Sequence, residues 1–359
     1  MSDENTILTV DLNALRANYR LLADRASPAR CAAAVKANAY GLGVEAVVPA
    51  LTIEGCDCFF VATFEEGVQV KPLAPAAEIY ILEGPKSTDL TTFITEGFIP
   101  VINTVASLRA IIDNPLPFAL HIDTGMNRLG VPVAEIEQLL TDEPDFLDTL
   151  PLKLVMSHLA AGGDPENEMN ARQLKEFNRI RALLPSVPAS LANSGGVLLG
   201  ASYHHHMVRS GIGLYGGAPG DDFKDVFEAV VRLEARVIQI KTIKAGESVG
   251  YDGAWVAKVD SIIATLTIGY ADGYSTSFFN NGKVLIGGEV APVVGKISMD
   301  LTTVDITHLG SDKVEVGDYA TLIGDELSLD TVAKSGNMHA YQLLTSLGTR
   351  VVRKYKLEE

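Results

Sequence analysis

The chain has 359 residues, of which 47% are hydrophobic, and its formal net charge is −16. A chain of this length and composition can form two domains with substantial cores, which excludes an intrinsically disordered protein. The acidic balance argues against nucleic acid and anionic membranes as partners, since both require a basic surface.

The N-terminus and the cysteines indicate a reducing, cytoplasmic setting. The first residues, Met1–Asn5, are acidic and lack the apolar stretch of a signal peptide. No apolar run reaches the length of about 18 residues that a membrane span needs. The three cysteines, Cys31, Cys56 and Cys58, lack the spacing of a zinc or redox motif, so we interpret them as buried small side chains.

In chain order, short apolar strands alternate with helical segments up to about residue 217. Asp11 is predicted to cap a first helix, whose apolar residues recur at helical spacing from Leu12 to Leu22. Eight such units favour a closed (β/α)8 barrel, and the lack of a GxGxxG after the first strand disfavours a dinucleotide-binding sheet. The predicted strands are Ala32–Lys36, Cys58–Ala62, Glu78–Leu82, Ile99–Ile102, Phe118–Ile122, Leu152–Met156, Ala189–Ala192 and His206–Val208.

After residue 225 the pattern changes to alternation with period two, which predicts a mostly β second domain. We therefore expect a barrel over residues 1–225 and a β-rich domain over 226–359, with the first strand of the chain as a candidate to pack against the second domain. The further predicted strands are Ala229–Lys241, Ser261–Thr267, Lys283–Ile286, Pro292–Val294, Thr302–Ile306 and Tyr319–Ile323.

Reactive side chains follow the predicted barrel strands, and active sites of such barrels lie at the carboxyl ends of the strands. Lys36 ends the first strand. A lysine in a dry pocket has a lowered pKa, and its neutral amine can form a Schiff base with an aldehyde. The alternative is a surface lysine that merely follows a strand. After later strands come His121–Gly130, His158, Asn193–Gly196 and Arg209–Ile212.

The glycine-containing loops after the seventh and eighth strands suit a phosphate group. Backbone N–H groups in such loops form anion cradles, to which Ser194 can add a hydroxyl. Glycine-rich loops are more often simple turns. Together with Lys36 on the same rim, however, they suggest a phosphate-bearing aldehyde, pyridoxal 5′-phosphate (PLP).

Six ordered motifs that span nearly the whole chain resemble the PLP-dependent, fold-type III family of alanine racemases. Val35–Gly43 resembles the family's PLP-lysine motif, and Asp123–Gly130 resembles its DTGMxRxG loop. The chain is identified on these motifs as a member of that family. The other four motifs are Arg209–Gly216, Val249–Tyr251, Ile268–Tyr274 and Gly295–Asp300.

The resemblance implies a role for each matching residue. Lys36 would hold PLP covalently and act as one acid–base, while Tyr251 would be the other, supplied by the second subunit of a homodimer. Arg209 would face the pyridine nitrogen, and His158 would belong to the hydrogen-bond network that tunes Tyr251. The other implied cofactor contacts are Tyr40, Asn193, Ser194, Gly211, Ile212 and Tyr341. The implied substrate contacts are Arg128, Met299, Asp300 and the entrance residue Tyr270.

General chemistry supports two opposed bases. Racemisation removes the α-proton from one face and returns one on the other, whereas a single base tends to return the proton to the same face. Lysine and tyrosine both have ordinary pKa values of about 10. The protein must therefore lower both pKa values if the two side chains are to exchange protons near neutral pH. Arg209 does not give up a proton, so it would leave the pyridine nitrogen unprotonated and disfavour transamination.

Several of these residues could instead have a purely structural role. Tyr251 alone could be a core aromatic, and Tyr270 and Tyr274 could be packing residues. The run His204–His206 invites a metal reading. Consecutive residues of an extended segment point to alternating sides, and no carboxylate pair accompanies them, so we expect no metal.

His121 departs from the family pattern. Many members have a carbamylated lysine there, which orients the substrate-binding arginine. Our hypothesis is that neutral His121 accepts a hydrogen bond from Arg128, or that a chloride ion or a water molecule fills the gap.

The predicted function is an alanine racemase that supplies D-alanine for peptidoglycan and acts on a small amino acid. A broad-spectrum or serine racemase would use the same scaffold. The fold-related basic-amino-acid decarboxylases fit less well because the Tyr251 and Met299 motifs match the racemase pattern. Non-catalytic PLP carriers resemble a lone barrel and would lack the second domain.

Overall fold

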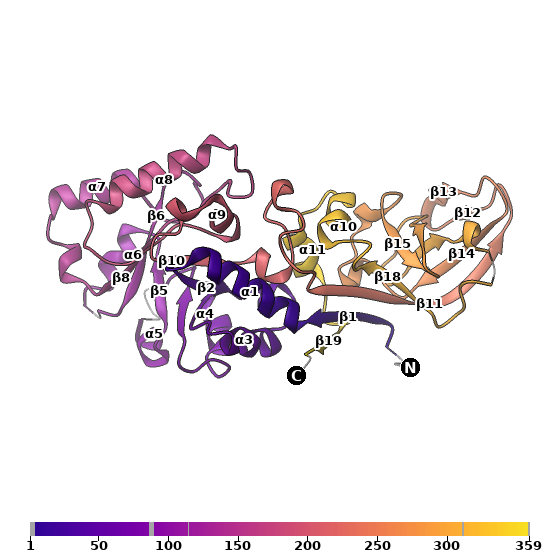
Figure 1. The fold of residues 1–359 in the computed structure, drawn as a ribbon, viewed down its shortest axis with the longest axis horizontal. Helices are drawn as coiled ribbons and strands as arrows, with labels where there is room; N and C mark the ends of the chain where they lie inside the picture. Colours follow the sequence, from indigo (N-terminus) through magenta and orange to yellow (C-terminus); the bar gives the residue numbers. More distant parts are fainter. Residues whose placement is uncertain (1–3, 86–89, 114, 311, 358–359) are drawn as a thin grey trace.

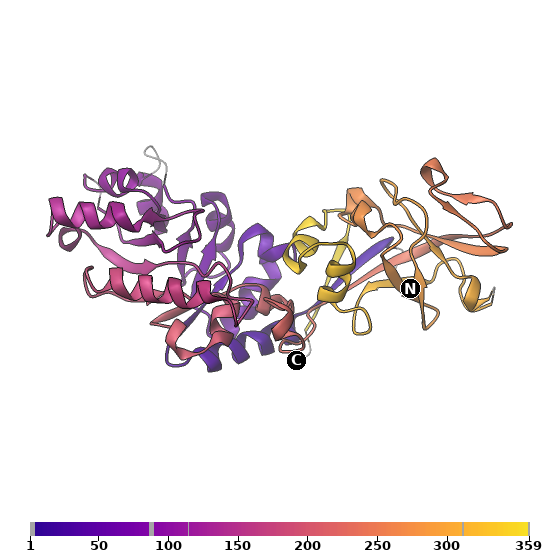
Figure 2. The same cartoon turned by 90° about the horizontal axis from the view of Figure 1, so that it is seen from above.

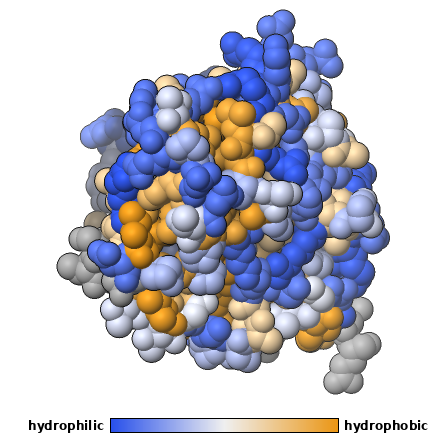
Figure 3. Space-filling view, turned by 90° about the vertical axis from the view of Figure 1, so that its left-hand side faces the viewer, coloured by the Kyte–Doolittle hydropathy of each residue, from blue (hydrophilic) through white to orange (hydrophobic). Residues whose placement is uncertain are grey.

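The computed structural model describes residues 4–85, 90–113, 115–310 and 312–357. The molecule is elongated, with a barrel of strands and helices at one end and a β-rich region at the other (Figures 1 and 2). At the end of the barrel farthest from the β-rich region, apolar residues are interspersed among hydrophilic ones (Figure 3).

Eight parallel strands form a closed ring in the N-terminal region. Around the ring their order is β2, β3, β4, β5, β6, β8, β9 and β10, and β10 pairs with β2 to close it. The predicted (β/α)8 barrel and its eight strands are thus confirmed, with small differences at strand ends. The short β7 (Val131–Pro132) pairs only with β6, outside the ring. The ring strands are β2 (Arg30–Ala34), β3 (Cys58–Val61), β4 (Glu78–Ile81), β5 (Ile99–Ile102), β6 (Phe118–Asp123), β8 (Leu152–Met156), β9 (Ala189–Ser190) and β10 (Met207–Ser210).

Helices surround this ring (Figures 1 and 2). The first begins where the sequence predicts, because Asp11 Oδ1 accepts hydrogen bonds from the N–H groups of Asn13 and Ala14. No helix in the described ranges is both long and apolar enough to cross a membrane. The barrel helices are α1 (Leu12–Ala26), α3 (Val44–Ile53), α4 (Phe64–Val70), α5 (Leu90–Glu96), α6 (Val105–Ala110), α7 (Val133–Asp142), α8 (Glu168–Arg181) and α9 (Ser194–Leu199).

The barrel has two apolar layers that follow from strand alternation. In β3, Cys58 and Phe60 belong to the small core inside the ring, whereas Phe59 and Val61 belong to the larger core beneath the helices. Successive side chains of each strand therefore point alternately inward and outward, and the predicted burial of the three cysteines is confirmed.

A long strand, β11 (Val231–Ile243), is central to the second region (Figure 1). The chain's first strand, β1 (Thr6–Asp11), lies between β11 and the last strand, β19 (Val352–Lys356). The N- and C-terminal strands therefore belong to one sheet. The other strands here are β12 (Ser248–Val249), β13 (Trp255–Val256), β14 (Ser261–Leu266), β15 (Lys283–Ile286), β16 (Glu289–Pro292), β17 (Thr302–Asp305) and β18 (Tyr319–Ile323).

The strand predicted at Pro292–Val294 is misplaced, since β16 covers Glu289–Pro292. Gly287 and Gly288, with φ of 57° and 81°, form a two-residue turn that pairs β16 with β15 in a hairpin. The turn fixes where the strand begins, and Val293 forms only an isolated bridge with Val304.

Two helices of the second region, α10 (Leu329–Ser335) and α11 (Ala340–Ser346), lie at the junction with the barrel (Figure 1). A Cβ atom on Gly41 would lie 2.5 Å from the carbonyl oxygen of Leu344 in α11. Arg353 and Tyr355 of β19 donate hydrogen bonds to the carbonyl groups of Gly41 and Leu42. The second region therefore packs against the chain just after the first barrel strand.

Candidate active site

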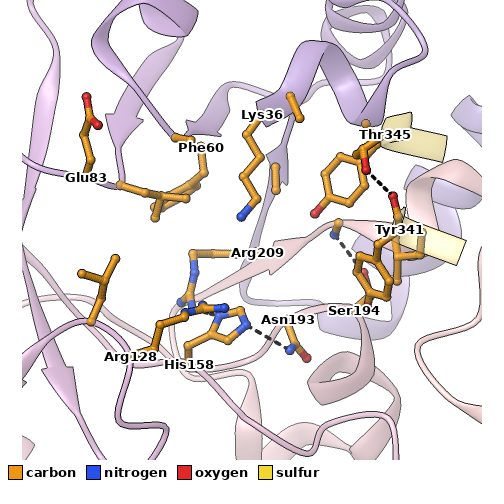
Figure 4. Close-up of a pocket in the computed structure, with 18 of the residues that line it drawn as sticks. Lys36, Phe60, Glu83, Arg128, His158, Asn193, Ser194, Arg209, Tyr341 and Thr345 are labelled. Carbon is orange, nitrogen blue, oxygen red and sulfur yellow. Dashed lines mark hydrogen bonds between the residues drawn. The ribbon is translucent and has the colours of Figure 1, made fainter. Parts of the chain in front are cut away.

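The carboxyl ends of the barrel strands surround a cavity of about 760 Å³ (Figure 4). Helix α11 contributes Tyr341 and Thr345 to its wall, so both regions of the chain form it. The cavity brings together most of the site residues predicted from the sequence. These are Lys36, Tyr40, His121, Arg128, His158, Asn193, Ser194, Arg209, Gly211, Ile212 and Tyr341.

Lys36 begins an unusual left-handed turn, α2 (Lys36–Tyr40). The strand predicted to end on Lys36 ends at Ala34 instead. The residues from Ala37 to Tyr40 all have positive φ, between 52° and 56°. For residues other than glycine this conformation costs about 1–2 kcal/mol each, so the surroundings must hold the turn.

A carboxylate provides part of that support. Glu66 of α4 accepts hydrogen bonds from the backbone N–H groups of Ala37 and Ala62, both at 2.7 Å. It thereby joins the Lys36 turn to the end of β3. On the other side, Asn38 Oδ1 accepts from the N–H of Val44 at 2.9 Å and caps α3. The backbone that follows Lys36 is thus held at two points.

The side chain of Lys36 points into the cavity toward Arg209 (Figure 4). Burial lowers the pKa of Lys36, the positive charge of Arg128 lowers it further, and Glu66 offsets part of the effect. These surroundings make the neutral, nucleophilic form of the amine easier to reach than it is for a lysine in water.

Arg209 is buried, with 5% of its surface exposed, and is held by neutral groups. It donates to Ser190 Oγ at 2.6 Å and to the Ser157 carbonyl oxygen at 2.5 Å, and its Nη2 lies 3.3 Å from His158 Nδ1. No carboxylate pairs with it among the residues that the structure describes. Burial lowers the pKa of Arg209 to about 10, so it remains a cation near neutral pH. Burial and the charge of Arg209 hold the pKa of His158 well below its usual range, which keeps that ring neutral.

The opposite end of the cavity has the features of a phosphate cradle. Ser194 Oγ accepts hydrogen bonds from the N–H groups of Gly211 and Gly213, at 2.8 and 3.3 Å. A Cβ atom on Gly211 would lie 2.7 Å from the Tyr40 hydroxyl, so the loop requires glycine there. Tyr40 stacks on Tyr215 with ring centroids 4.5 Å apart. A hydroxyl-lined cradle at one end and a lysine amine at the other fit a phosphate-bearing aldehyde such as PLP.

Four predicted site residues lie outside this cavity, on the β-rich region. Tyr251 is 68% exposed, Met299 is 53% exposed, and Tyr270 and Asp300 are also exposed. The described chain therefore does not bring Tyr251 to its own Lys36.

These four residues nevertheless lie on neighbouring segments. The N–H of Ala271, next to Tyr270, donates to the carbonyl oxygen of Met299 at 2.9 Å. Arg350 bridges Asp272 and Asp300, and Lys296 pairs with Asp252, beside Tyr251, at 2.6 Å. They form one exposed group, which we call the Tyr251 surface: Tyr251, Tyr270, Met299 and Asp300.

Several residues at the cavity were not identified from the sequence. Phe60 and Glu83 line the cavity, whereas Glu66 and Asn103 bond to the lining residues Ala37 and His121. Glu83 and Asn103 follow β4 and β5 closely, so the strand-end rule used for Lys36 would have found them. Glu66 fits the Thr-x-x-Glu pattern of a helix cap. Because this local pattern already accounts for the glutamate, the sequence does not suggest its contact with the Lys36 turn.

The histidine run His204–His206 is accounted for by local contacts. His204 Nε2 lies 3.0 Å from the carbonyl oxygen of Val197, and His205 packs edge-on against Phe177. His206 Nδ1 accepts a hydrogen bond from the N–H of Ala189. Over the described ranges, no group of three or more histidine, cysteine or acidic side chains is placed to hold a metal ion.

Comparisons with known solved structures agree with this architecture. An alanine racemase structure from Bartonella henselae, with covalently bound pyridoxal phosphate, shares 39% identity and a TM-score of 0.93, covering 98% of this chain and 99% of that one. A biosynthetic alanine racemase from Pseudomonas aeruginosa shares 34% identity and a TM-score of 0.91, covering 99% and 100% of the two chains.

Sequence comparisons lead to the same family. The family models "Alanine racemase, N-terminal domain" and "Alanine racemase, C-terminal domain" match residues 10–219 and 230–355. An alanine racemase from Methylobacterium nodulans is 41% identical over 99% of this chain and 97% of its own length. One from Rhizobium meliloti is 42% identical over 97% and 96%. The resemblance seen in the motifs is therefore confirmed, and the chain belongs to the alanine racemase family.

Proposed function

We propose that this protein is a PLP-dependent alanine racemase that interconverts L-alanine and D-alanine. The proposal is based mainly on the arrangement inside the cavity. Lys36 points toward the buried Arg209, and the described residues provide no carboxylate partner for Arg209. A cationic arginine at this place would leave a pyridine nitrogen unprotonated, which suits racemisation better than transamination.

Different cavity residues would contact different parts of the cofactor. Lys36 Nζ would hold PLP covalently, and Arg209 would donate to its ring nitrogen. Tyr40, Ser194, Gly211, Ile212 and Tyr341 would surround its phosphate, with Asn193 fixing the start of α9 through its bond to the Gly196 N–H. When bound, PLP supplies the electron sink that makes the Cα–H of an amino acid acidic.

Proton transfer at Cα then requires one base on each face. Lys36 Nζ serves one face from within the cavity. Tyr251, which is exposed and distant on its own chain, would serve the other face from a second copy of the protein. We therefore infer a homodimer with shared active sites, in which the Tyr251 surface of each copy completes the cavity of the other. His158 would tune the partner's tyrosine through its bonding with Arg209.

The substrate carboxylate would be held by charge and by backbone groups. Arg128 lines the cavity and is an exposed residue. Met299 and Asp300 of a second copy would complete this carboxylate site, and Tyr270 would narrow its entrance. The matched relatives come from bacteria, which supports a role in supplying D-alanine for peptidoglycan in the cytoplasm.

Absorbance and a substrate panel test this function. We expect the purified protein to show a band at about 420 nm from the lysine-bound cofactor, and to racemise alanine faster than other small L-amino acids. The absence of the band after incubation with PLP would contradict the cofactor assignment. Faster turnover of serine would indicate a broad-spectrum or serine racemase, and formation of carbon dioxide from lysine or arginine would indicate a decarboxylase.

A further inference from the structure

The carboxylate of Glu66 connects two residues that line the cavity, Ala37 and Ala62. Its Oε1 accepts from the N–H of Ala37 and its Oε2 accepts from the N–H of Ala62, both at 2.7 Å. Ala37 directly follows Lys36, and Ala62 directly follows strand β3. One side chain therefore ties the Lys36 turn to the end of the neighbouring barrel strand.

The position of Glu66 in helix α4 would ordinarily give it a local role. Thr63 caps this helix, and its Oγ1 accepts the N–H of Glu66 at 3.4 Å. In a capping box, the glutamate returns this bond by accepting from the N–H of the cap residue. The two oxygens of Glu66 instead accept from groups outside the helix, one of them 29 positions away in the sequence. Capping of α4 therefore does not account for this arrangement.

The two N–H groups that meet at Glu66 call for a carboxylate. A glutamine of the same length has one oxygen and one NH₂ group, so its NH₂ would face one of the two N–H donors. Hydrogen bonds to an ionised acceptor are shorter and roughly twice as strong as those between neutral groups. The distance of 2.7 Å for both bonds fits this class of interaction.

The bond to Ala37 acts on the first residue of the strained turn. Ala37 has a φ of 52°, and a run of such residues persists only where its surroundings hold it. The side chain of Lys36 leaves the backbone one residue earlier and points into the cavity (Figure 4). A shift of Ala37 would therefore move Lys36 Nζ, and a displacement of about 1 Å at a reacting group can cost about a hundredfold in rate.

Glu66 also places a negative charge near Lys36. Burial and the charge of Arg128, from the loop after β6, lower the pKa of Lys36, whereas Glu66, from α4, raises it. Arg209 and the neutral ring of His158 line the same cavity. Loss of the Glu66 charge alone should therefore lower the pKa of Lys36 further.

We propose that Glu66 is a positioning residue for Lys36: its carboxylate fixes Ala37 to the end of β3 and thereby holds Lys36 Nζ where it can bond to the cofactor and reach the substrate Cα. The effect on rate rests on the proposed racemase function. The hold on the turn does not depend on that function.

Hydrogen–deuterium exchange of the holoenzyme, followed by mass spectrometry, tests the hold on the turn and needs no substrate. Glu66→Gln should raise the exchange rate of residues 37–43 about ten- to a hundredfold, because the loss of a charged hydrogen bond lets the turn open more often. Glu135→Gln is the matched control, since Glu135 is an exposed glutamate in the first turn of α7 and does not line the cavity. Unchanged exchange in Glu66→Gln would overturn the proposal, whatever the activity of the enzyme.

Steady-state kinetics over a range of pH test the effect on Lys36. Glu66→Gln should lower kcat for alanine about ten- to a hundredfold, with a smaller change in KM, because the displaced group is the base and not the carboxylate site. In the direction in which Lys36 takes the α-proton, the fall of kcat at low pH should move to lower pH. The reason is that glutamine no longer stabilises the lysine cation. Glu66→Asp keeps the charge but is one methylene shorter, so it should lower kcat with a smaller movement of this limb.

These readouts separate the positioning of Lys36 from general support of the fold. If exchange in Glu66→Gln rises equally throughout the barrel, or if kcat falls by the same factor at every pH, the proposal is wrong. If Glu66→Gln does not fold, the wild-type holoenzyme still decides. Its Ala37 amide should exchange at least about a hundredfold more slowly than in an unfolded chain, and fast exchange would overturn the proposal. A wild-type enzyme with the expected exchange but no racemase activity would contradict the proposed function instead.

Discussion

Replacing Lys36 with alanine is expected to lower racemisation at least about a thousandfold, because the same amine holds the cofactor and serves one face of Cα. Lys36 Nζ points into the cavity, and burial together with Arg128 lowers its pKa. The described cavity lining contains no second lysine that could take its place. The variant should also lose the absorbance band of the lysine-bound cofactor.

Lys258→Ala provides the matched control, since Lys258 is exposed on the β-rich region and does not line the cavity. Thermal unfolding of both variants would show whether the left-handed turn survives the loss of the Lys36 side chain. If Lys36→Ala folds normally and keeps either the band or wild-type turnover, the assignment of Lys36 is wrong.

Replacing Tyr251 with phenylalanine is expected to lower racemisation about a hundred- to ten-thousandfold, the usual contribution of a general acid–base. The equilibrium between the enantiomers requires kcat/KM to fall by the same factor in both directions. The loss of one base should instead become visible in exchange of the α-hydrogen. In D₂O, Lys36 alone should still exchange this hydrogen in one enantiomer without inverting it.

The measurement is therefore the ratio of exchange to racemisation for each enantiomer, followed by proton NMR and chiral chromatography. Tyr203→Phe, a half-buried tyrosine outside the cavity, is the control for loss of a hydroxyl group. Equal and mild losses of exchange from L- and D-alanine would contradict the two-base scheme.

Local patterns were sufficient to predict most of the fold. The barrel strands are short apolar runs bounded by helices, so periodicity and length distinguished them, as at Ile99–Ile102 and Leu152–Met156. Asp11 was identified as a helix cap because its side chain reaches backbone N–H groups close in sequence. The strand-end rule then placed Lys36, His158 and Arg209 at one cavity.

The parts that were missed depend on contacts between distant segments. Alanine and tyrosine do not favour positive φ, so the turn from Ala37 to Tyr40 depends on contacts with distant segments such as Glu66 and helix α11. No local pattern reveals the bond between Asn103 and His121, because it joins the residue after β5 to a residue of β6, 18 positions away. The distance between Lys36 and Tyr251 is likewise a property of the whole fold.

The proposed active site is shared between two copies of the chain, and mixing two inactive variants tests this sharing. Lys36→Ala and Tyr251→Phe would be unfolded and refolded together, or co-expressed with different tags. In a two-fold symmetric dimer, each mixed pair has one site with both substitutions and one intact site. The mixture should regain about one quarter of wild-type activity per chain, because about half of the dimers are mixed. If verified mixed dimers are as inactive as the parent variants, Tyr251 does not act at the active site that holds the Lys36 of another copy, and the site is not shared.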